Sequence, residues 1–380
     1  MKKSLTMFLG IFLALSILSL SSCFDDSTSP SDGDDDVTTG EWEVVDLNDL
    51  FSLDLSEMIG VSLNDIFVLD ENHIWLSSEL SSDSSGTVII SSKDGGASWQ
   101  LVNEGCDLGN MHKAVYLDAD NGISVSDHDF IYTTDGGASW SRNTEIDNTF
   151  NIDSYSVALG TASTDSYILY CNYGGADYTT GNGLAFMNIN MQISDFLNFD
   201  DLNIESYSAG GLDLPAIVNN GTDIFIPNLK VTGTTVEKLG IYSNDNLQLI
   251  DIDYFDAGDY IEDIYFLNTN EGWLITNFDR VYKTTDAGRN WQYIYYSVGK
   301  FGGDDAEIIF TDSDTGYCNN TFAGQLQDKV YKTTDGGSTW NPVSGTTSMW
   351  GMQDLNFTDA KHGFAVGGGT FEFQGWNLYT

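Results

Sequence analysis

Basic side chains are scarce in this chain. Its 380 residues include 14 lysines and arginines against 57 aspartates and glutamates, which gives a formal net charge of −43 at pH 7. A surface of this charge repels nucleic acid phosphates and anionic lipid headgroups. We interpret the acidic runs as solvated surface, and nucleic acid is not expected as a partner.

Cysteine and histidine are also rare, with four of each. No spacing between them matches a zinc site, so no metal-ligand cluster is predicted. Beyond the N-terminus, no segment is long and apolar enough to cross a bilayer.

The N-terminus has the pattern of a secretion signal. Lys2 and Lys3 form a basic head before the apolar residues 5–20. The apolar core ends in Leu20-Ser21-Ser22-Cys23, which resembles the lipobox of bacterial lipoproteins. Residues 1–22 are therefore predicted to be a lipoprotein signal peptide, with Cys23 as the lipid attachment site. The alternative is an ordinary signal peptide with an incidental cysteine.

Residues 23–40 are polar and acidic, which predicts a disordered tether. The aspartates at positions 25 and 26, just after Cys23, resemble the surface-export signal of Bacteroidetes-type lipoproteins. The lipid is the expected contact with the membrane. The expected location is the bacterial cell envelope, at the outer membrane or cell surface or facing the periplasm.

An eight-residue turn with the pattern [ST]-x-D-[GA]-G-x-x-W occurs four times, each time between two extended runs. The aspartate can accept backbone hydrogen bonds from about two residues further on. The glycine suits a positive φ, and the tryptophan anchors the outer strand. These residues are predicted to stabilise the repeat, with metal or substrate binding as the alternative. They are Asp94, Gly96, Trp99, Asp135, Gly137, Trp140, Asp286, Gly288, Trp291, Asp335, Gly337 and Trp340.

A second pattern, consisting of a strand, an Asp/Asn-rich turn and a strand, begins at residues 65, 114, 263, 308 and 355. Between Asp135 and Asp286 there is room for two further units of about 40–50 residues. We assign one to residues 153–200 and the other to a remnant of the eight-residue turn around Asp245. The total is seven units.

The eight-residue turn resembles the Asp-box, or bacterial neuraminidase repeat, of β-propellers. Together the two patterns are similar to the photosystem II stability/assembly-factor family, over about residues 41–380. The resemblance implies an all-β fold, a seven-bladed β-propeller with Asp-box hairpins, that acts as a secreted or lipid-anchored binding scaffold. Photosynthetic members carry an arginine-rich binding face. This chain has three arginines in all, so the same partner is not expected.

The two ends of the propeller are predicted to meet. Residues 41–47 read as the strand after a repeated turn, and residues 377–380 as the strand before one. The N-terminal strand would then complete the last blade and protect its edge. The alternative is a truncation at Thr380, where a fifth turn would begin.

Cys106, Cys171 and Cys318 fall on predicted blades one, three and six. Strands that far apart cannot be joined by a disulfide, so buried free thiols are expected. The turns at 118–122 and 312–316 present closely spaced oxygens, which makes calcium an alternative there. Neither has the full spacing of a calcium loop, so both are interpreted as hairpin turns and no cofactor is expected.

Two enzyme classes share the Asp-box. Sialidases need three converging arginines, whereas Arg142, Arg280 and Arg289 lie in or near the repeated turns, on the outer strands. Xyloglucanases pack two propellers around a cleft, and one is predicted here. The chain is therefore interpreted as a non-catalytic binding or assembly module with a protein or glycan ligand. A secreted glycoside hydrolase that uses a pair of carboxylates is the alternative.

The links from an outer strand to the next innermost strand open at the mouth of the central channel, where ligands usually bind. These links are predicted at 110–113, 258–262, 302–307 and 348–354. Their aromatic and acidic side chains suit sugars, cations or a basic peptide. In the alternative, the aromatics cap the core and the acids face water. The candidate ligand face consists of His112, Tyr260, Asp304, Asp305 and Trp350.

Overall fold

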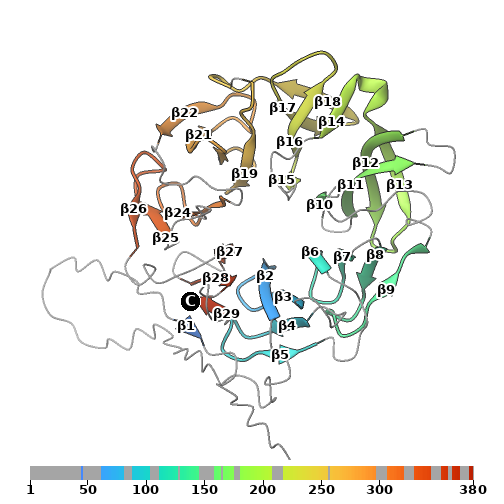
Figure 1. Ribbon diagram of the computed structural model, residues 1–380, viewed down its shortest axis with the longest axis vertical. Helices are drawn as coiled ribbons and strands as arrows, with labels where there is room; N and C mark the ends of the chain where they lie inside the picture. The colour runs from blue at the N-terminus through green and yellow to red at the C-terminus, as the bar shows by residue number, and fades with distance from the viewer. Residues whose placement is uncertain are drawn as a thin grey trace, which may run out of the picture.

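The computed structural model is an all-β protein whose sheets stand around a central axis, the arrangement of a β-propeller (Figure 1). The ranges that the structure describes are 44–45, 61–80, 88–102, 111–126, 129–144, 158–163, 166–174, 180–207, 217–255, 257–296, 306–320, 329–343, 352–357, 362–368 and 376–379. Within them, no helix has the length and hydrophobicity needed to cross a membrane.

The described strands form seven antiparallel sheets. The first three contain β2–β5 (Val61–Val68, Ile74–Leu80, Val88–Ser92, Gln100–Leu101), β6–β9 (Met111–Tyr116, Gly122–Ser126, Asp129–Thr133, Ser141–Arg142) and β10–β13 (Ala158–Ser163, Ser166–Gly174, Thr180–Asn188, Ile193–Asn198). The fourth contains β14–β18 (Ile204–Tyr207, Val218–Asn219, Ile224–Val231, Lys238–Ser243, Asn246–Ile250), preceded by the 3₁₀ turn η3 (Asp200–Leu202). The last three contain β19–β22 (Ile261–Phe266, Gly272–Thr276, Arg280–Thr284, Gln292–Tyr296), β23–β26 (Ile308–Phe310, Gly316–Asn320, Lys329–Thr333, Asn341–Pro342) and β27–β29 (Met352–Phe357, Gly363–Gly368, Trp376–Tyr379) with β1 (Val44–Val45).

The first and last strands join in one sheet. β1 pairs antiparallel with β29, with Val44 opposite Tyr379 and Val45 opposite Leu378. This sheet has the order β1-β29-β28-β27, so its outermost strand comes from the N-terminal side of the chain. The prediction that the N-terminal strand completes the last sheet is confirmed. The pairing also covers an edge of β29 that would otherwise be open.

Aromatic rings pack neighbouring sheets against each other. In each case an aromatic residue of one sheet's second strand stacks on one from the next sheet's innermost strand. The ring centroids are 4.0 Å apart in Trp75–Tyr116, 4.2 Å in Phe225–Phe266, 3.6 Å in Trp273–Phe310 and 4.2 Å in Tyr317–Phe357. The core therefore lies between the sheets, and the sheets of β19–β22 and β23–β26 each contribute to two such contacts.

The repeated turn depends on its first residue as much as on its aspartate. The buried Thr133 hydroxyl donates to Asp135 Oδ1 at 2.8 Å and accepts from the N–H groups of Asp135 and Gly137. The Asp135 carboxylate accepts from the backbone N–H of Ser139 at 2.8 Å and from its hydroxyl at 2.6 Å. The aspartate thus binds the residue four positions on, not the expected two. The turns at Asp94, Asp286 and Asp335 repeat these bonds.

Three sheets lack the repeated turn, and two of them close their outer hairpins differently. Between β17 and β18, Asn244 and Asp245 have φ values of 51° and 58°, which form a two-residue turn of type I′. The predicted remnant of the eight-residue turn around Asp245 is therefore wrong. Between β12 and β13, Asn188 Oδ1 accepts from the N–H groups of Asn190 and Gln192. These donors lie two and four residues on, as do the N–H groups that Thr133 binds.

Acidic side chains link the innermost strands of neighbouring sheets. Each accepts a hydrogen bond from a backbone N–H of the next sheet. The donating residue comes directly after the acidic residue of that sheet or, in β6, after the residue at the equivalent position. The acceptor–donor pairs are Asp65–Ala114 at 3.0 Å, Asp263–Ile308 at 2.9 Å, Glu307–Leu355 at 2.7 Å and Asp354–Ile66 at 2.8 Å. We call these four pairs the carboxylate links. At the junction between β16 and β19, Asn228 exchanges two bonds with the backbone of Ile261, at 2.7 and 2.8 Å.

Local irregularities in the strands precede three of the four N–H groups that donate in the carboxylate links. The pairing register of β2 shifts just before Asp65, and that of β27 shifts just before Asp354. β6 has a similar shift just before the donor Ala114, whereas the pairs of β23, which contains the donor Ile308, run without a shift. A bulge releases a backbone group from the ladder and turns the strand. The released N–H can then bond to the neighbouring sheet.

Removal of the turn's bonds should lower stability. We expect Asp135→Ala to reduce the free energy of unfolding by about 1–3 kcal/mol, because it deprives the Thr133 hydroxyl and Ser139 of an acceptor. Gly337→Val should also destabilise, since Gly337 has φ 97° and an added Cβ would lie 2.9 Å from Ile294 Cδ1. Urea unfolding measures both, with exposed Asp120→Ala as the matched control. An unchanged midpoint accompanied by lost ligand binding would contradict the structural role.

The effect of Asp135→Ala should also depend on pH. Partial burial opposes ionisation of Asp135, but hydrogen bonds from Ser139 and Thr133 hold its pKa below the ordinary value. The stabilisation is therefore complete above the unfolded-state pKa of about 4 and is lost as the pH falls through the lower folded-state value.

Candidate functional site

The structure places the predicted ligand-face residues only in part. His112 lies in β6, and Tyr260 comes directly before β19, so both belong to segments that lead into innermost strands. The side chain of His112 and all of Asp304, Asp305 and Trp350 lie outside what the structure describes. Of the five predicted residues, Tyr260 is therefore the one whose side chain the structure describes.

Hydrogen bonds hold the Tyr260 segment against the β20–β21 turn. Asn277 Oδ1 accepts from the N–H of Tyr260 at 3.0 Å, and the N–H of Asn277 donates to the Tyr260 carbonyl at 3.1 Å. Asn277 Nδ2 donates to the Gly258 carbonyl at 3.0 Å. The Tyr260 side chain is half-buried. Residues 257–260 of the link between β18 and β19 therefore have a defined course.

An ion pair ties the same link to β21. Arg280 Nη1 lies 2.6 Å from Asp259 Oδ2, and it also donates to the Tyr254 carbonyl at 2.9 Å. The Asp259 side chain is 3 % exposed. Partial burial opposes the charge of Arg280, but the Asp259 carboxylate raises the pKa of the guanidinium above its ordinary value. Arg280 thus neutralises a buried charge and fixes the backbone of the link.

Aromatic side chains are exposed around Arg280. Tyr254 is 73 % exposed, Phe278 48 % and Tyr293 38 %. The Tyr254 and Tyr293 rings lie 5.9 Å apart, and Arg280 Cζ lies 5.8 Å from the centre of the Phe278 ring. Tyr282, whose hydroxyl donates to the Asp253 carbonyl, packs below Tyr293 with centroids 5.6 Å apart. We call Tyr254, Phe278, Arg280 and Tyr293 the aromatic patch.

The three arginines of the chain are held apart. Arg142 in β9 pairs with Asp129, and Arg280 at the start of β21 pairs with Asp259. Arg289 lies beyond the far end of β21, and the strand alone spans about 14 Å from Arg280 to Thr284. Arg142 belongs to a different sheet. The guanidinium groups therefore do not gather around one carboxylate, as a sialidase site requires.

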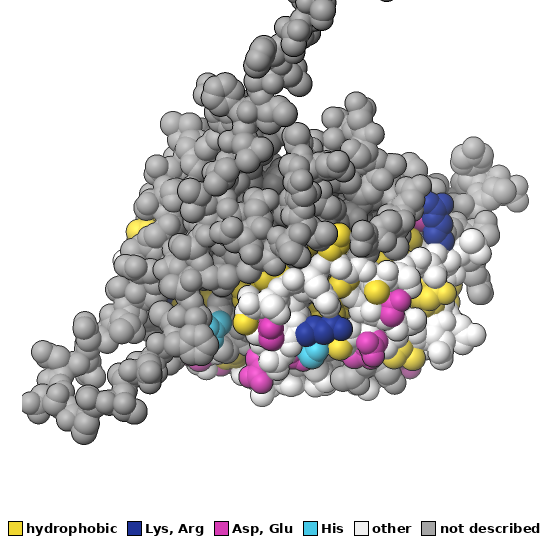
Figure 2. All heavy atoms as spheres, turned by 90° about the horizontal axis from the view of Figure 1, so that it is seen from below, with side chains coloured by type: hydrophobic (Ala, Val, Ile, Leu, Met, Phe, Trp, Pro, Cys, Tyr) yellow, Lys and Arg dark blue, Asp and Glu magenta, His cyan; other side chains and the backbone are white. Residues whose placement is uncertain are grey.

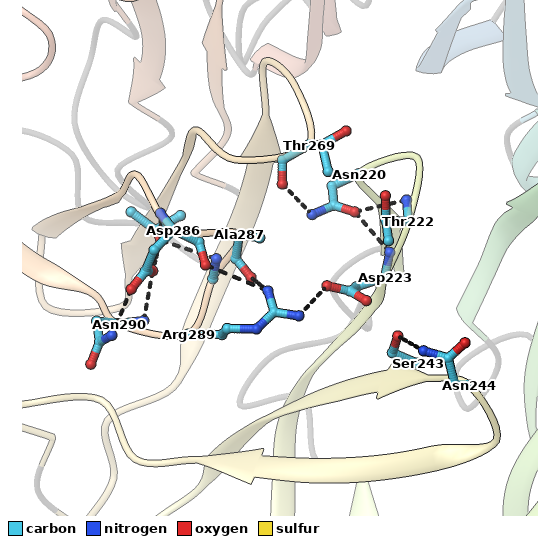
Figure 3. Close-up of polar contacts among 12 residues, drawn as sticks. Asn220, Thr222, Asp223, Ser243, Asn244, Thr269, Asp286, Ala287, Arg289 and Asn290 are labelled. Atoms are coloured by element: carbon cyan, nitrogen blue, oxygen red, sulfur yellow. Dashed lines mark hydrogen bonds and ion pairs between the residues drawn. The ribbon is translucent and has the colours of Figure 1, made fainter.

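Arg289 connects two neighbouring sheets (Figure 3). Its guanidinium donates to Asp223 Oδ2 and to the Ala287 carbonyl, each at 3.0 Å. Asp223 is buried in the turn before β16. On the other side of this contact, Asn220 Nδ2 donates to the Thr269 carbonyl at 2.8 Å. Arg289 belongs to the repeated turn at Asp286, where it stands at the position that alanine or serine occupies in the other three repeated turns. It joins the sheet of β14–β18 to that of β19–β22.

The two turns considered for calcium use their carboxylates internally. Asp118 Oδ1 accepts from the N–H groups of Asp120 and Asn121, and Asp312 Oδ1 accepts from those of Asp314 and Thr315. These bonds are those of the expected hairpin turns. In the described part of the chain, no three His, Cys, Asp or Glu side chains gather closely enough to hold a metal ion.

The cysteine prediction is confirmed for Cys318, which is buried and free. Burial raises the pKa of its thiol, and nearby acids including Asp263 act in the same direction. Cys171 lies in β11, in a different sheet.

Figure 2 shows one face of the molecule, on which the described charged side chains include acids and few lysines or arginines.

Loss of Arg280 should loosen the link. We expect Arg280→Gln to lower the free energy of unfolding by about 2–4 kcal/mol, because it leaves Asp259 charged, buried and unpaired. The double variant Arg280→Gln/Asp259→Asn should lose less than the sum of the single variants. Chemical unfolding of the four proteins measures this coupling. Strictly additive losses would show that the pair does not hold the link.

Comparisons with known proteins place the fold. No family model matches the chain, and no curated protein matches it. The solved structure described as YCF48 bound to D1 peptide is 13 % identical, with coverage of 90 % of this chain and 97 % of that one and a TM-score of 0.54. YCF48 from Cyanidioschyzon merolae is 16 % identical, with coverage of 89 % and 98 % and a TM-score of 0.53.

A third solved structure carries a different description. It is a putative 6-phosphogluconolactonase from Bacteroides uniformis that is 13 % identical, with coverage of 81 % of this chain and 95 % of that one and a TM-score of 0.53. Identities this low establish a shared fold and no shared activity. The chain has the β-propeller fold of these proteins.

Proposed function

We propose that this chain is a seven-bladed Asp-box propeller that acts as a non-catalytic binding or assembly scaffold outside the cytoplasm. The seven sheets and the four matching hydrogen-bonded turns support the architecture. The Leu20–Cys23 sequence supports attachment of a lipid at Cys23 and a place in the bacterial cell envelope.

The observation that carries the binding role is the aromatic patch beside the link before β19. Tyr254 on the link, Phe278 in the β20–β21 turn and Tyr293 in β22 present ring surface to solvent. Hydrogen bonds and the Arg280–Asp259 pair hold the link against that turn. Exposed apolar surface that is fixed in position is typical of an interaction site. The separation of the three arginines counts against the sialidase alternative.

A protein is the ligand class that we favour. One solved structure with this fold is described as bound to a peptide, and that is a property of that protein. For this chain, we propose that the face formed by the links between sheets receives a protein ligand. Tyr260 belongs to this face, together with the predicted residues His112, Asp304, Asp305 and Trp350.

The lipid anchor has a direct test. In cells fed an alkyne-tagged fatty acid, we expect the wild-type chain to carry the label and to partition with membranes. Cys23→Ser should lose both properties, since the thiol is the proposed acceptor. Globomycin should also block processing. If Cys23→Ser left the label and the partition unchanged, lipidation at this residue would be ruled out.

The binding role and the hydrolase alternative make different predictions for the ligand face. We expect wild type to bind on a protein array without turning over any glycan, and Trp350→Ala to weaken that binding. Asp304→Asn/Asp305→Asn is the matched carboxylate variant. Glycan turnover that disappears in the carboxylate variant would instead establish a hydrolase. If neither variant altered any binding, these residues would not form the functional face.

A further inference from the structure

The exposed aromatic surface is concentrated at one place. Among the described residues, the exposed large hydrophobic side chains are Leu202, Tyr254, Phe278 and Tyr293. The last three belong to the aromatic patch, while Leu202 lies on η3, before the neighbouring sheet. The patch is therefore a continuous feature, in contrast to a single exposed side chain of the ordinary kind.

The backbone presents the most exposed ring outward. Tyr254 has φ 68°, in the left-handed region that residues other than glycine enter infrequently. Three contacts hold this segment: Arg280 binds the Tyr254 carbonyl, Tyr282 binds the Asp253 carbonyl, and the N–H of Phe255 donates to the Ile252 carbonyl. The Tyr254 ring is thus exposed on a fixed backbone, which reduces the entropy lost on binding.

The charge around the patch favours a cationic ligand. Four aspartates lie on the link or the adjacent turn: Asp251, Asp253, Asp259 and Asp279. The basic groups paired with them in the described part of the chain are Lys238 and Arg280. Lys238 pairs with Asp251, and Arg280 pairs with Asp259. The chain as a whole has a net charge of −43. Both the local and the overall field therefore attract positive charge.

The chain already packs cations on aromatic rings. Arg280 lies over Phe278 within the patch, Lys283 Nζ lies 4.5 Å from the centre of the Trp273 ring, and Lys332 Nζ lies 5.2 Å from that of Tyr317. Guanidinium and ammonium groups bind the faces of aromatic rings in this way. Tyr254 and Tyr293 offer the same kind of surface to solvent.

We propose that the aromatic patch binds an arginine- or lysine-bearing segment of a partner protein. A cationic side chain of this segment lies on the ring of Tyr254 or Tyr293, close to the exposed acid Asp253, while its aliphatic part covers the neighbouring ring. The inference rests on the proposed binding function, and it adds the location and the chemical class of the ligand.

The test uses the mature chain and two synthetic twelve-residue peptides of the same sequence. One carries three arginines and the other three citrullines, which keep the shape of arginine without its charge. By fluorescence anisotropy, we expect the arginine peptide to bind at least tenfold more tightly, with an affinity that falls as salt is added. Equal binding of the two peptides, or no binding of either up to about 1 mM, would overturn the proposal.

Variants locate the contact. Tyr254→Ala/Tyr293→Ala should weaken binding of the arginine peptide at least tenfold, while Tyr254→Phe retains most of it because the ring face remains. Leu202→Ala is the matched control, since it removes an exposed apolar side chain away from the patch and should leave binding unchanged. Unchanged binding by the double alanine variant would show that the patch is not the site.

Cross-linking in cells separates this proposal from the broader one. If wild type captures a partner protein and Tyr254→Ala/Tyr293→Ala captures it equally well, the patch is wrong and the scaffold function stands. If wild type captures no protein, the proposed function itself fails. A glycan whose binding depends on Tyr254 and Tyr293 would contradict the assignment of a cationic peptide.

Discussion

The interaction on which the propeller depends is a hydrogen bond across the gap between neighbouring sheets, from a backbone N–H to a buried or half-buried acid. Innermost strands have a free edge toward the channel, so stacking of aromatic side chains alone would leave the orientation of each sheet poorly defined. The carboxylate links fix that orientation, because Asp354 accepts from both Ile66 of the next sheet and Leu355 of its own. A buried N–H left without such an acceptor would cost about 1–3 kcal/mol.

The propeller keeps the residues that stabilise it apart from those that can bind a ligand. In an antiparallel four-stranded sheet, the turn between the third and fourth strands lies at one end and the link to the next sheet lies at the other. The repeated turns, with Asp94, Asp135, Asp286 and Asp335, occupy the first end. The Tyr254–Tyr260 link and the β20–β21 turn occupy the second. Substitutions on the link face can therefore change the ligand without removing the bonds of the repeated turns.

The sequence was most informative where one residue type has one local role. The repeated turns could be predicted because their bonds join residues two and four positions apart, as between Thr133 and Gly137. The turn at Asp245 was misread, since two left-handed residues can close a hairpin without the eight-residue pattern. The carboxylate links were missed, although an acid directly precedes four of the five apolar runs, at Asp65, Asp263, Glu307 and Asp354. Their donors lie in another sheet, and no local sequence pattern specifies which backbone N–H group such a side chain will meet there. The same is true of Tyr254 and Tyr293, which meet only when β22 packs beside the link.

Hydrogen exchange at the amide of Ile66 tests the central claim most directly. In wild type this N–H is bound by Asp354 Oδ2 at 2.8 Å, across the junction between the last and first sheets. If the carboxylate links hold the ring, Asp354→Asn should speed exchange at Ile66 and lower the free energy of unfolding, while Asp253→Asn on the exposed link should do neither. Equal protection of Ile66 in wild type and Asp354→Asn, with unchanged stability, would contradict the account.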